Sequence, residues 1–134
     1  MKSVAIAYCA TLLAFAGIDF VWLSFAGERL YRPVLKDILI DGFEPAPAVA
    51  FYLLFAAGLV ILAVRPGLDA SSLRLAAGNG ALMGFFAYAT YDLTNQATLR
   101  NWTTTLTLAD LAWGTALSAL AAALGYAAAR AFAA

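Results

Sequence analysis

The feature that most constrains this chain is a series of apolar runs, each long enough to cross a lipid bilayer. The first run extends from Ser3 to Ala26, and Asp19 is its charged residue. As a helix it would measure roughly 36 Å at 1.5 Å per residue, more than the ~30 Å of hydrocarbon in a bilayer. Ala14-Phe-Ala16 resembles a signal-peptide cleavage site, but the apolar run continues well beyond it. We therefore interpret the run as a first transmembrane helix.

The composition supports an integral membrane protein. Of 134 residues, 64% are hydrophobic and 12% are charged, whereas soluble domains carry about 25% charged residues. The net charge is zero, which argues against nucleic acid as a partner. Because histidine is absent and Cys9 is the one cysteine, zinc, haem and iron–sulfur sites lack their usual ligands. We expect no metal and no cofactor, and a Ser-His-Asp or Cys-His catalytic set is excluded.

Proline and glycine mark the predicted helix boundaries in the rest of the chain. Glu44-Pro-Ala-Pro47 precedes the second apolar run, and Arg65-Pro-Gly67 follows it as a stop signal. The pattern predicts one membrane domain over residues 1–134, an all-α bundle of four transmembrane helices. Their approximate ranges are 3–26, 46–64, 73–95 and 106–129.

The longest polar connection joins the first two predicted spans. Within residues 28–40, apolar side chains recur at helical spacing, and Pro33 would occupy the first turn, where its missing N–H costs little. This predicts a short amphipathic helix lying in the membrane interface. A flexible loop is the alternative.

The third predicted helix changes character along one face. Gly80 and Gly84 would allow a neighbouring helix to approach closely. Further along, a phenol, a carboxylate and an amide recur on the same face, at Tyr88, Asp92 and Asn95. Polar groups of this kind are costly in hydrocarbon and mark functional sites.

In a four-helix topology, the polar groups of all four helices converge toward one side of the membrane. Asp19, Asp92 and Asp110 are the candidates for acid–base catalysis. Arg100 is the loop cation best placed to reach Asp92 or Asp110. The candidate ligand-binding residues are Tyr52, Tyr88, Tyr91, Asn95, Trp22, Trp113 and Arg100.

The first and fourth predicted helices share an Asp-x-x-Trp pattern. Asp19-Phe-Val-Trp22 and Asp110-Leu-Ala-Trp113 both place an indole one helical turn after an acid. We interpret the two pairs as walls of one polar pocket. Two alternatives remain open. The tryptophans could be interfacial anchors, and Tyr88 and Tyr91 could simply hydrogen-bond to Asp92 and hold the helices together.

Several segments resemble a family of small bacterial membrane proteins, domain of unknown function 2177. The most specific is Tyr91-Asp-Leu-Thr-Asn95, and the resemblance covers nearly the whole chain. It implies a four-helix, multi-pass protein of the bacterial inner membrane, and it implies no activity. The other segments that carry it are Asp19-x-x-Trp22, Tyr31, Phe51-Tyr52, Ala97-Thr98-Leu99, Trp102 and Asp110-x-x-Trp113-Gly114.

Three functions fit these observations. The first is a membrane-embedded protein whose acidic, aromatic-lined pocket binds a lipid-like or small apolar molecule. A stronger version of this hypothesis is that the protein also modifies the bound molecule. The second is a proton-coupled transporter of small molecules, and the third is a non-catalytic subunit of a larger membrane complex. The expected partners are membrane lipid, the lipid-like ligand, and either a second copy of the chain or a larger complex. Cationic residues are balanced between the two sides, so the positive-inside rule gives no orientation.

Overall fold

The computed structural model describes residues 1–133, and the regular elements within that range are all helices. The predicted all-α fold class is therefore confirmed. Three helices are long and apolar enough to cross a membrane, namely Lys2–Leu35, Pro45–Asp69 and Thr104–Phe132. A further helix, α5 (Leu73–Thr98), has a comparable length but is less apolar.

The first helix is longer than predicted. After α1 (Lys2–Ala26) the backbone continues through a π-helical turn, η1 (Gly27–Tyr31), into α2 (Arg32–Leu35). The prediction of a separate interfacial helix over 28–40 was thus wrong, because its helical part ends at Leu35 and belongs to the first helix. Gly27 adopts ordinary right-handed helical angles, so it does not end the helix. The wider π turn ends at Tyr31, two residues before Pro33, and lets the helix continue past a residue that would otherwise break it.

The second helix also continues past a proline through a π-helical turn. α3 (Pro45–Leu59) leads through a π-helical turn, η2 (Val60–Val64), into α4 (Arg65–Asp69). The predicted stop at Arg65-Pro-Gly67 was therefore wrong. Pro66 has no N–H to offer the carbonyl of Leu62, four residues earlier. The side-chain amide of Asn79, on α5, donates to that carbonyl at 3.0 Å, which supplies a donor the proline lacks.

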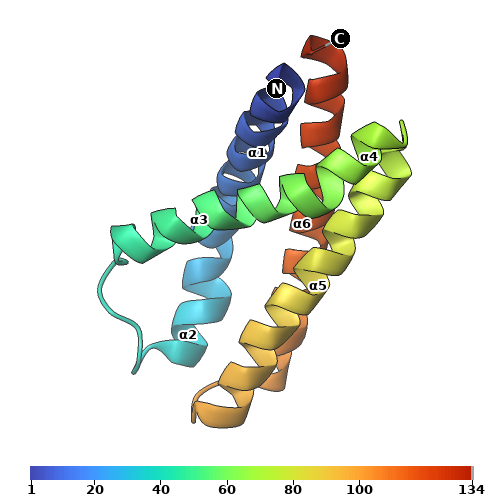
Figure 1. The fold of residues 1–134 in the computed structure, drawn as a ribbon. Coiled ribbons are helices and arrows are strands. Elements are labelled where there is room, and N and C mark those ends of the chain that lie inside the picture. The colour runs from blue at the N-terminus through green and yellow to red at the C-terminus, as the bar shows by residue number, and fades with distance from the viewer. Residues whose placement is uncertain (134) are drawn as a thin grey trace.

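The helices α5 and α6 (Thr104–Phe132) form the most extensive helix pair, and they lie side by side in Figure 1. Ser72 and Thr103 cap their N-termini by accepting from Leu75 N–H and Leu106 N–H. Gly84 lies against Ser118 and the carbonyl of Gly114, where a Cβ would clash. The small face predicted for this helix is thus the face that contacts α6.

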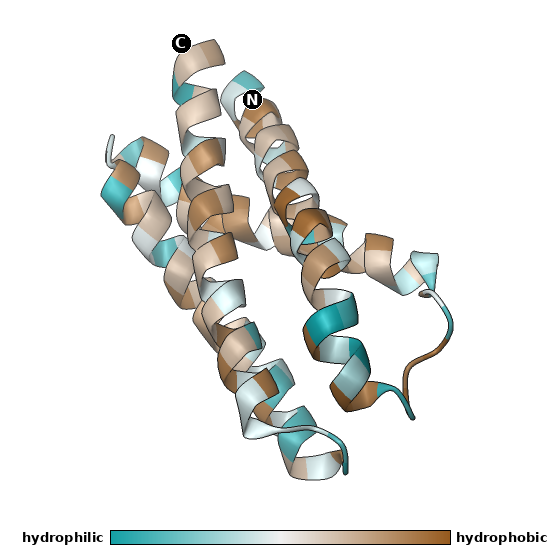
Figure 2. Cartoon of the chain, turned by 180° about the vertical axis from the view of Figure 1, so that it is seen from behind, coloured by the Kyte–Doolittle hydropathy of each residue, from teal (hydrophilic) through white to brown (hydrophobic). Residues whose placement is uncertain are grey.

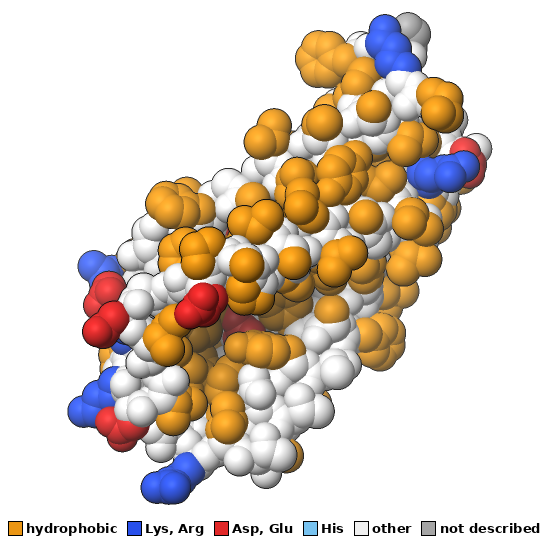
Figure 3. Space-filling model, turned by 60° about the vertical axis from the view of Figure 1, so that its left-hand side comes forward, with side chains coloured by type: hydrophobic (Ala, Val, Ile, Leu, Met, Phe, Trp, Pro, Cys, Tyr) orange, Lys and Arg blue, Asp and Glu red, His pale blue; other side chains and the backbone are white. Residues whose placement is uncertain are grey.

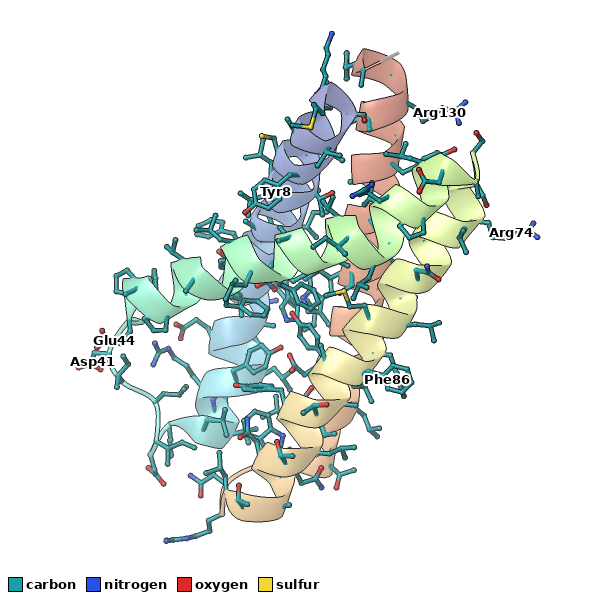
Figure 4. The ribbon with its side chains drawn as sticks, in the orientation of Figure 1. Tyr8, Asp41, Glu44, Arg74, Phe86 and Arg130 are labelled. Carbon is teal, nitrogen blue, oxygen red and sulfur yellow. The ribbon has the colours of Figure 1, made fainter. Side chains whose placement is uncertain are left out.

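The remaining helices complete the bundle. α1 packs on α6, and α3 crosses the others obliquely, while the two termini lie at the same end (Figure 1). Hydrophobic colours dominate the helix lengths and hydrophilic colours gather toward their ends (Figure 2). Arg74 and Arg130 lie toward the end that holds the termini, whereas Asp41 and Glu44 lie in the connection before α3, away from it (Figure 4).

Candidate functional site

The three acids predicted from the sequence all point into the bundle. Asp19 of α1 is 7% exposed, Asp92 of α5 is 0% exposed and Asp110 of α6 is 6% exposed. Each comes from a different helix, so folding is what brings them to the interior. Their immediate surroundings differ, and these differences determine what each carboxyl group can do.

Asp19 is held by two aromatic donors from two other helices. The hydroxyl of Tyr52 on α3 donates to Asp19 Oδ2 at 2.6 Å, and the indole N–H of Trp113 on α6 donates to Oδ1 at 3.0 Å. Both donors were predicted as site residues. The Asp19 carboxyl therefore joins α1, α3 and α6 at one point.

Asp110 is held by a two-step chain from the first helix. Tyr31 donates its hydroxyl to Asp110 Oδ1 at 2.5 Å, and Trp22 donates its indole N–H to the Tyr31 oxygen at 2.9 Å. The indole rings of Trp22 and Trp113 stack with centroids 4.5 Å apart and planes 12° apart. Both tryptophans thus face the interior of the bundle and lie in the acid network, which argues against the interpretation as interfacial anchors.

Asp92 is different from the other two acids. It is fully buried against Asp110, whose carboxyl group is a hydrogen-bond partner when one of the two acids is protonated, and within residues 1–133 its oxygens receive no other hydrogen bond. The alternative in which Tyr88 and Tyr91 hydrogen-bond to Asp92 was therefore wrong. The ring of Tyr88 lies over Gly114 instead, and that of Tyr91 meets Trp102 edge to face at 5.6 Å.

A cavity of about 660 Å³ adjoins this network. Its volume falls within the 300–1,000 Å³ typical of small-molecule sites. Hydrophobic side chains surround a hollow in this part of the surface, with acidic side chains at its rim and inside it (Figure 3). The predicted site residues that line the cavity are Asp19, Tyr52, Tyr88, Tyr91, Asp110 and Trp113.

The other four predicted site residues lie outside the cavity lining. Asp92 lies behind Asp110, and Trp22 behind its stacking partner Trp113. Asn95 is half-buried near the end of α5. Arg100 lines a second hollow with Asp37, at the turn after α5. The expectation that Arg100 reaches Asp92 or Asp110 was therefore wrong: the turn directs its side chain elsewhere.

Sequence reasoning missed three parts of the site. Tyr31 entered it only through the family resemblance, because the π turn that carries it was read as a polar connection. Glu28 and Arg32 line the cavity near its exposed rim and pair at 3.5 Å, and their i, i+4 spacing was a signal that could have indicated this pair. The apolar wall was also missed, and it includes Leu23, Leu35, Leu39, Phe43 and Phe51.

This arrangement can accept hydrogen bonds and protons, and it can surround an apolar chain. Its polar groups are carboxylates, phenols, an indole and, near the rim, the guanidinium of Arg32. Within residues 1–133, no three His, Cys, Asp or Glu side chains are grouped so that they could hold a metal ion. At the inner end of the cavity, Asp19 and Asp110 are the carboxyl groups that a bound molecule could contact directly.

Comparison with known proteins connects this fold to one family. Residues 4–127 match the family model described as "Predicted membrane protein (DUF2177)". No curated protein and no solved structure match the chain. The match covers all three acids and every cavity-lining residue named above.

Proposed function

We propose that this chain, which belongs to the DUF2177 family of predicted membrane proteins, binds a lipid-like or small apolar molecule in the cavity beside Asp19 and Asp110. The observation that carries the proposal is the cavity itself, which is wide, apolar along its wall and polar at its inner end. Ligand sites commonly combine these two kinds of lining. The proposed location is the bacterial inner membrane, as the family resemblance implies.

The burial of the acids supports binding. Asp19 and Asp110 remain almost fully buried although they face a cavity of about 660 Å³. Carboxyl groups in membrane helices are costly, at about 2.5–3.5 kcal/mol near the bilayer centre on insertion scales. Such groups can be retained because a ligand uses them. In the fuller form of the proposal, these two carboxyls also transfer protons to or from the bound molecule.

A cavity-filling substitution tests the proposal. Ala48 of α3 lines the cavity, whereas Ala50, two residues later, is exposed on the same helix. Ala48→Trp should reduce the amphiphile that co-purifies with the protein in a maltoside detergent, as counted by mass spectrometry of the extracted material. Ala50→Trp is the matched control and should leave that amount unchanged. Equal amounts in the two variants and the unaltered protein would show that the cavity is not the binding site.

A non-catalytic subunit is the second candidate, and one observation favours it. Asp19 and Asp110 already receive hydrogen bonds from Tyr52, Trp113 and Tyr31, so the network could serve only to join the helices. That function predicts a stoichiometric protein partner on mild purification and no amphiphile in the cavity. The co-purification experiment therefore distinguishes the two candidates. Proton-coupled transport remains a third candidate, and no contact described above favours it.

A further inference from the structure

The charges around the cavity are unbalanced at its inner end. Asp19 and Asp110 both line it. The cation that lines the cavity is Arg32, which pairs with Glu28 near the exposed rim at 3.5 Å. Within residues 1–133, that pair is the one salt bridge in the structure. The inner acids therefore have no cation of their own.

The other cations near this end of the bundle point elsewhere. Arg29 lies over the ring of Phe25, at 4.3 Å from its centroid. Arg100 lines the second hollow, and Lys36 is exposed after α2. A buried carboxylate without a counter-charge is strongly unfavourable. A positively charged ligand at the inner end would offset that cost, whereas a carboxylate or phosphate head group would add to it.

The aromatic lining of the same end fits a particular kind of cation. Tyr31, Tyr52, Tyr88 and Trp113 all line the cavity together with the two acids. Aromatic faces attract ammonium groups, and cages of such rings bind quaternary ammonium ligands. A metal ion fits less well, because no three ligating side chains are grouped within the part of the chain that the structure describes.

We propose that the cavity takes an amphiphile with an ammonium head group, which lies between Asp19 and Asp110 while its alkyl chain follows the apolar wall formed by Leu23, Leu35, Leu39 and Phe51. This inference rests on the proposed function, since it requires that the cavity bind an amphiphile at all. It adds the charge of the head group and the position in which that group is held.

The test compares three probes that share one alkyl chain: dodecyltrimethylammonium, dodecanol and dodecanoate. Each is added to the full chain in a neutral maltoside detergent, and bound probe is counted by native mass spectrometry. We expect the ammonium probe to bind about tenfold more tightly than dodecanoate, because charge attraction and ring contacts both favour it. Equal or tighter binding of dodecanol or dodecanoate would overturn the inference and leave the proposed function intact. Binding of none of the three would overturn both.

Substitutions locate the head group. Asp19→Asn and Asp110→Asn should each weaken binding of the ammonium probe about tenfold, while dodecanol binding stays within a factor of about two. Asp69→Asn is the matched control, because Asp69 is exposed at the end of α4 and does not line the cavity. Unchanged ammonium binding in both Asp19→Asn and Asp110→Asn would overturn the inference. If either variant fails to fold, the three-probe comparison on the unaltered protein still decides it.

Discussion

The indole of Trp113 on α6 donates its hydrogen bond to Asp19 on α1, at 3.0 Å, although Asp110 lies one turn before it on its own helix. Trp22 in turn donates to Tyr31, which donates to Asp110. The hydrogen bonds of the two Asp-x-x-Trp segments are therefore crossed. Trp113 donates to the acid of the first segment, and Trp22 is linked through Tyr31 to the acid of the second. The stacked rings of Trp22 and Trp113 bring the two hydrogen-bonded acids into one network.

Trp113→Phe should lower the free energy of unfolding by about 1–3 kcal/mol, the usual cost of removing one partner of a buried hydrogen bond. An aromatic ring remains to face Trp22, so most of the stacking area is kept. Denaturant or thermal unfolding in detergent measures the change. Trp22→Phe is the comparison and should cost less, because the Tyr31 to Asp110 bond stays intact. A larger loss in Trp22→Phe would contradict the crossed arrangement.

Tyr31→Phe should destabilise the protein more than Tyr52→Phe. Within residues 1–133, Tyr31 is the one aromatic donor to Asp110, whereas Asp19 keeps Trp113 when Tyr52 is lost. We expect a loss of about 1–3 kcal/mol for Tyr31→Phe, since a nearly buried carboxyl is left without its donor. Parallel unfolding curves of the two variants give the comparison. The reverse order would mean that Asp110 has another donor, such as water in the cavity.

Asn79→Ala should cost about 0.6 kcal/mol, the average worth of a hydrogen bond between membrane helices. Its amide donates to the carbonyl of Leu62, which Pro66 leaves without its usual backbone donor. The test is a double-mutant cycle with Pro66→Ala, measured by unfolding in detergent. Because alanine restores an N–H at position 66, Asn79→Ala should cost less in that background. Strict additivity of the two substitutions would show that Asn79 does not compensate for the proline.

The sequence predicted the helical class and the inward orientation of the three acids because both depend on local rules. Long apolar runs must be helical in a bilayer, and isolated acids within them must face the bundle interior. Helix ends were less predictable. The first helix was predicted to end at Ala26 and the second at Arg65-Pro-Gly67, but a π turn before Pro33 and another before Pro66 let each helix continue. At the second turn the carbonyl of Leu62 accepts from Asn79 on another helix, a contact that a single sequence does not display.

The same limit applies to the partners of each acid. Tyr88, Tyr91 and Asp92 stand at i, i+3 and i+4 on α5, which places all three on one helix face and predicted that the two tyrosines lie near Asp92. Their rings instead pack on Gly114 and Trp102. The donors to Asp19 and Asp110 come from other helices, so their assignment required the packing of the whole bundle.

Gly84→Ala should destabilise the bundle by about 1–3 kcal/mol, the cost of overpacking a tight interface. A Cβ at Gly84 would meet Ser118 and the carbonyl of Gly114 on α6. Gly78→Ala is the matched control on the same helix, because a Cβ there meets nothing within 4 Å. It should leave stability unchanged or raise it slightly, since alanine favours a helix more than glycine does. Equal effects of the two substitutions would show that close approach at Gly84 does not limit the packing.

Asp92→Asn should leave the free energy of unfolding unchanged or raise it, in contrast to Asp19→Asn. Apart from the carboxyl of Asp110, Asp92 has no hydrogen-bond partner within residues 1–133. The amide of asparagine can still donate to Asp110, and a buried amide is less costly than a buried carboxylate. Asp19→Asn places an amide between two donors, Tyr52 and Trp113, and should cost about 1–3 kcal/mol. Unfolding in detergent ranks the two variants. A marked loss of stability in Asp92→Asn would show that its carboxyl has a partner, such as a buried water or a bound ligand, which is lost on substitution.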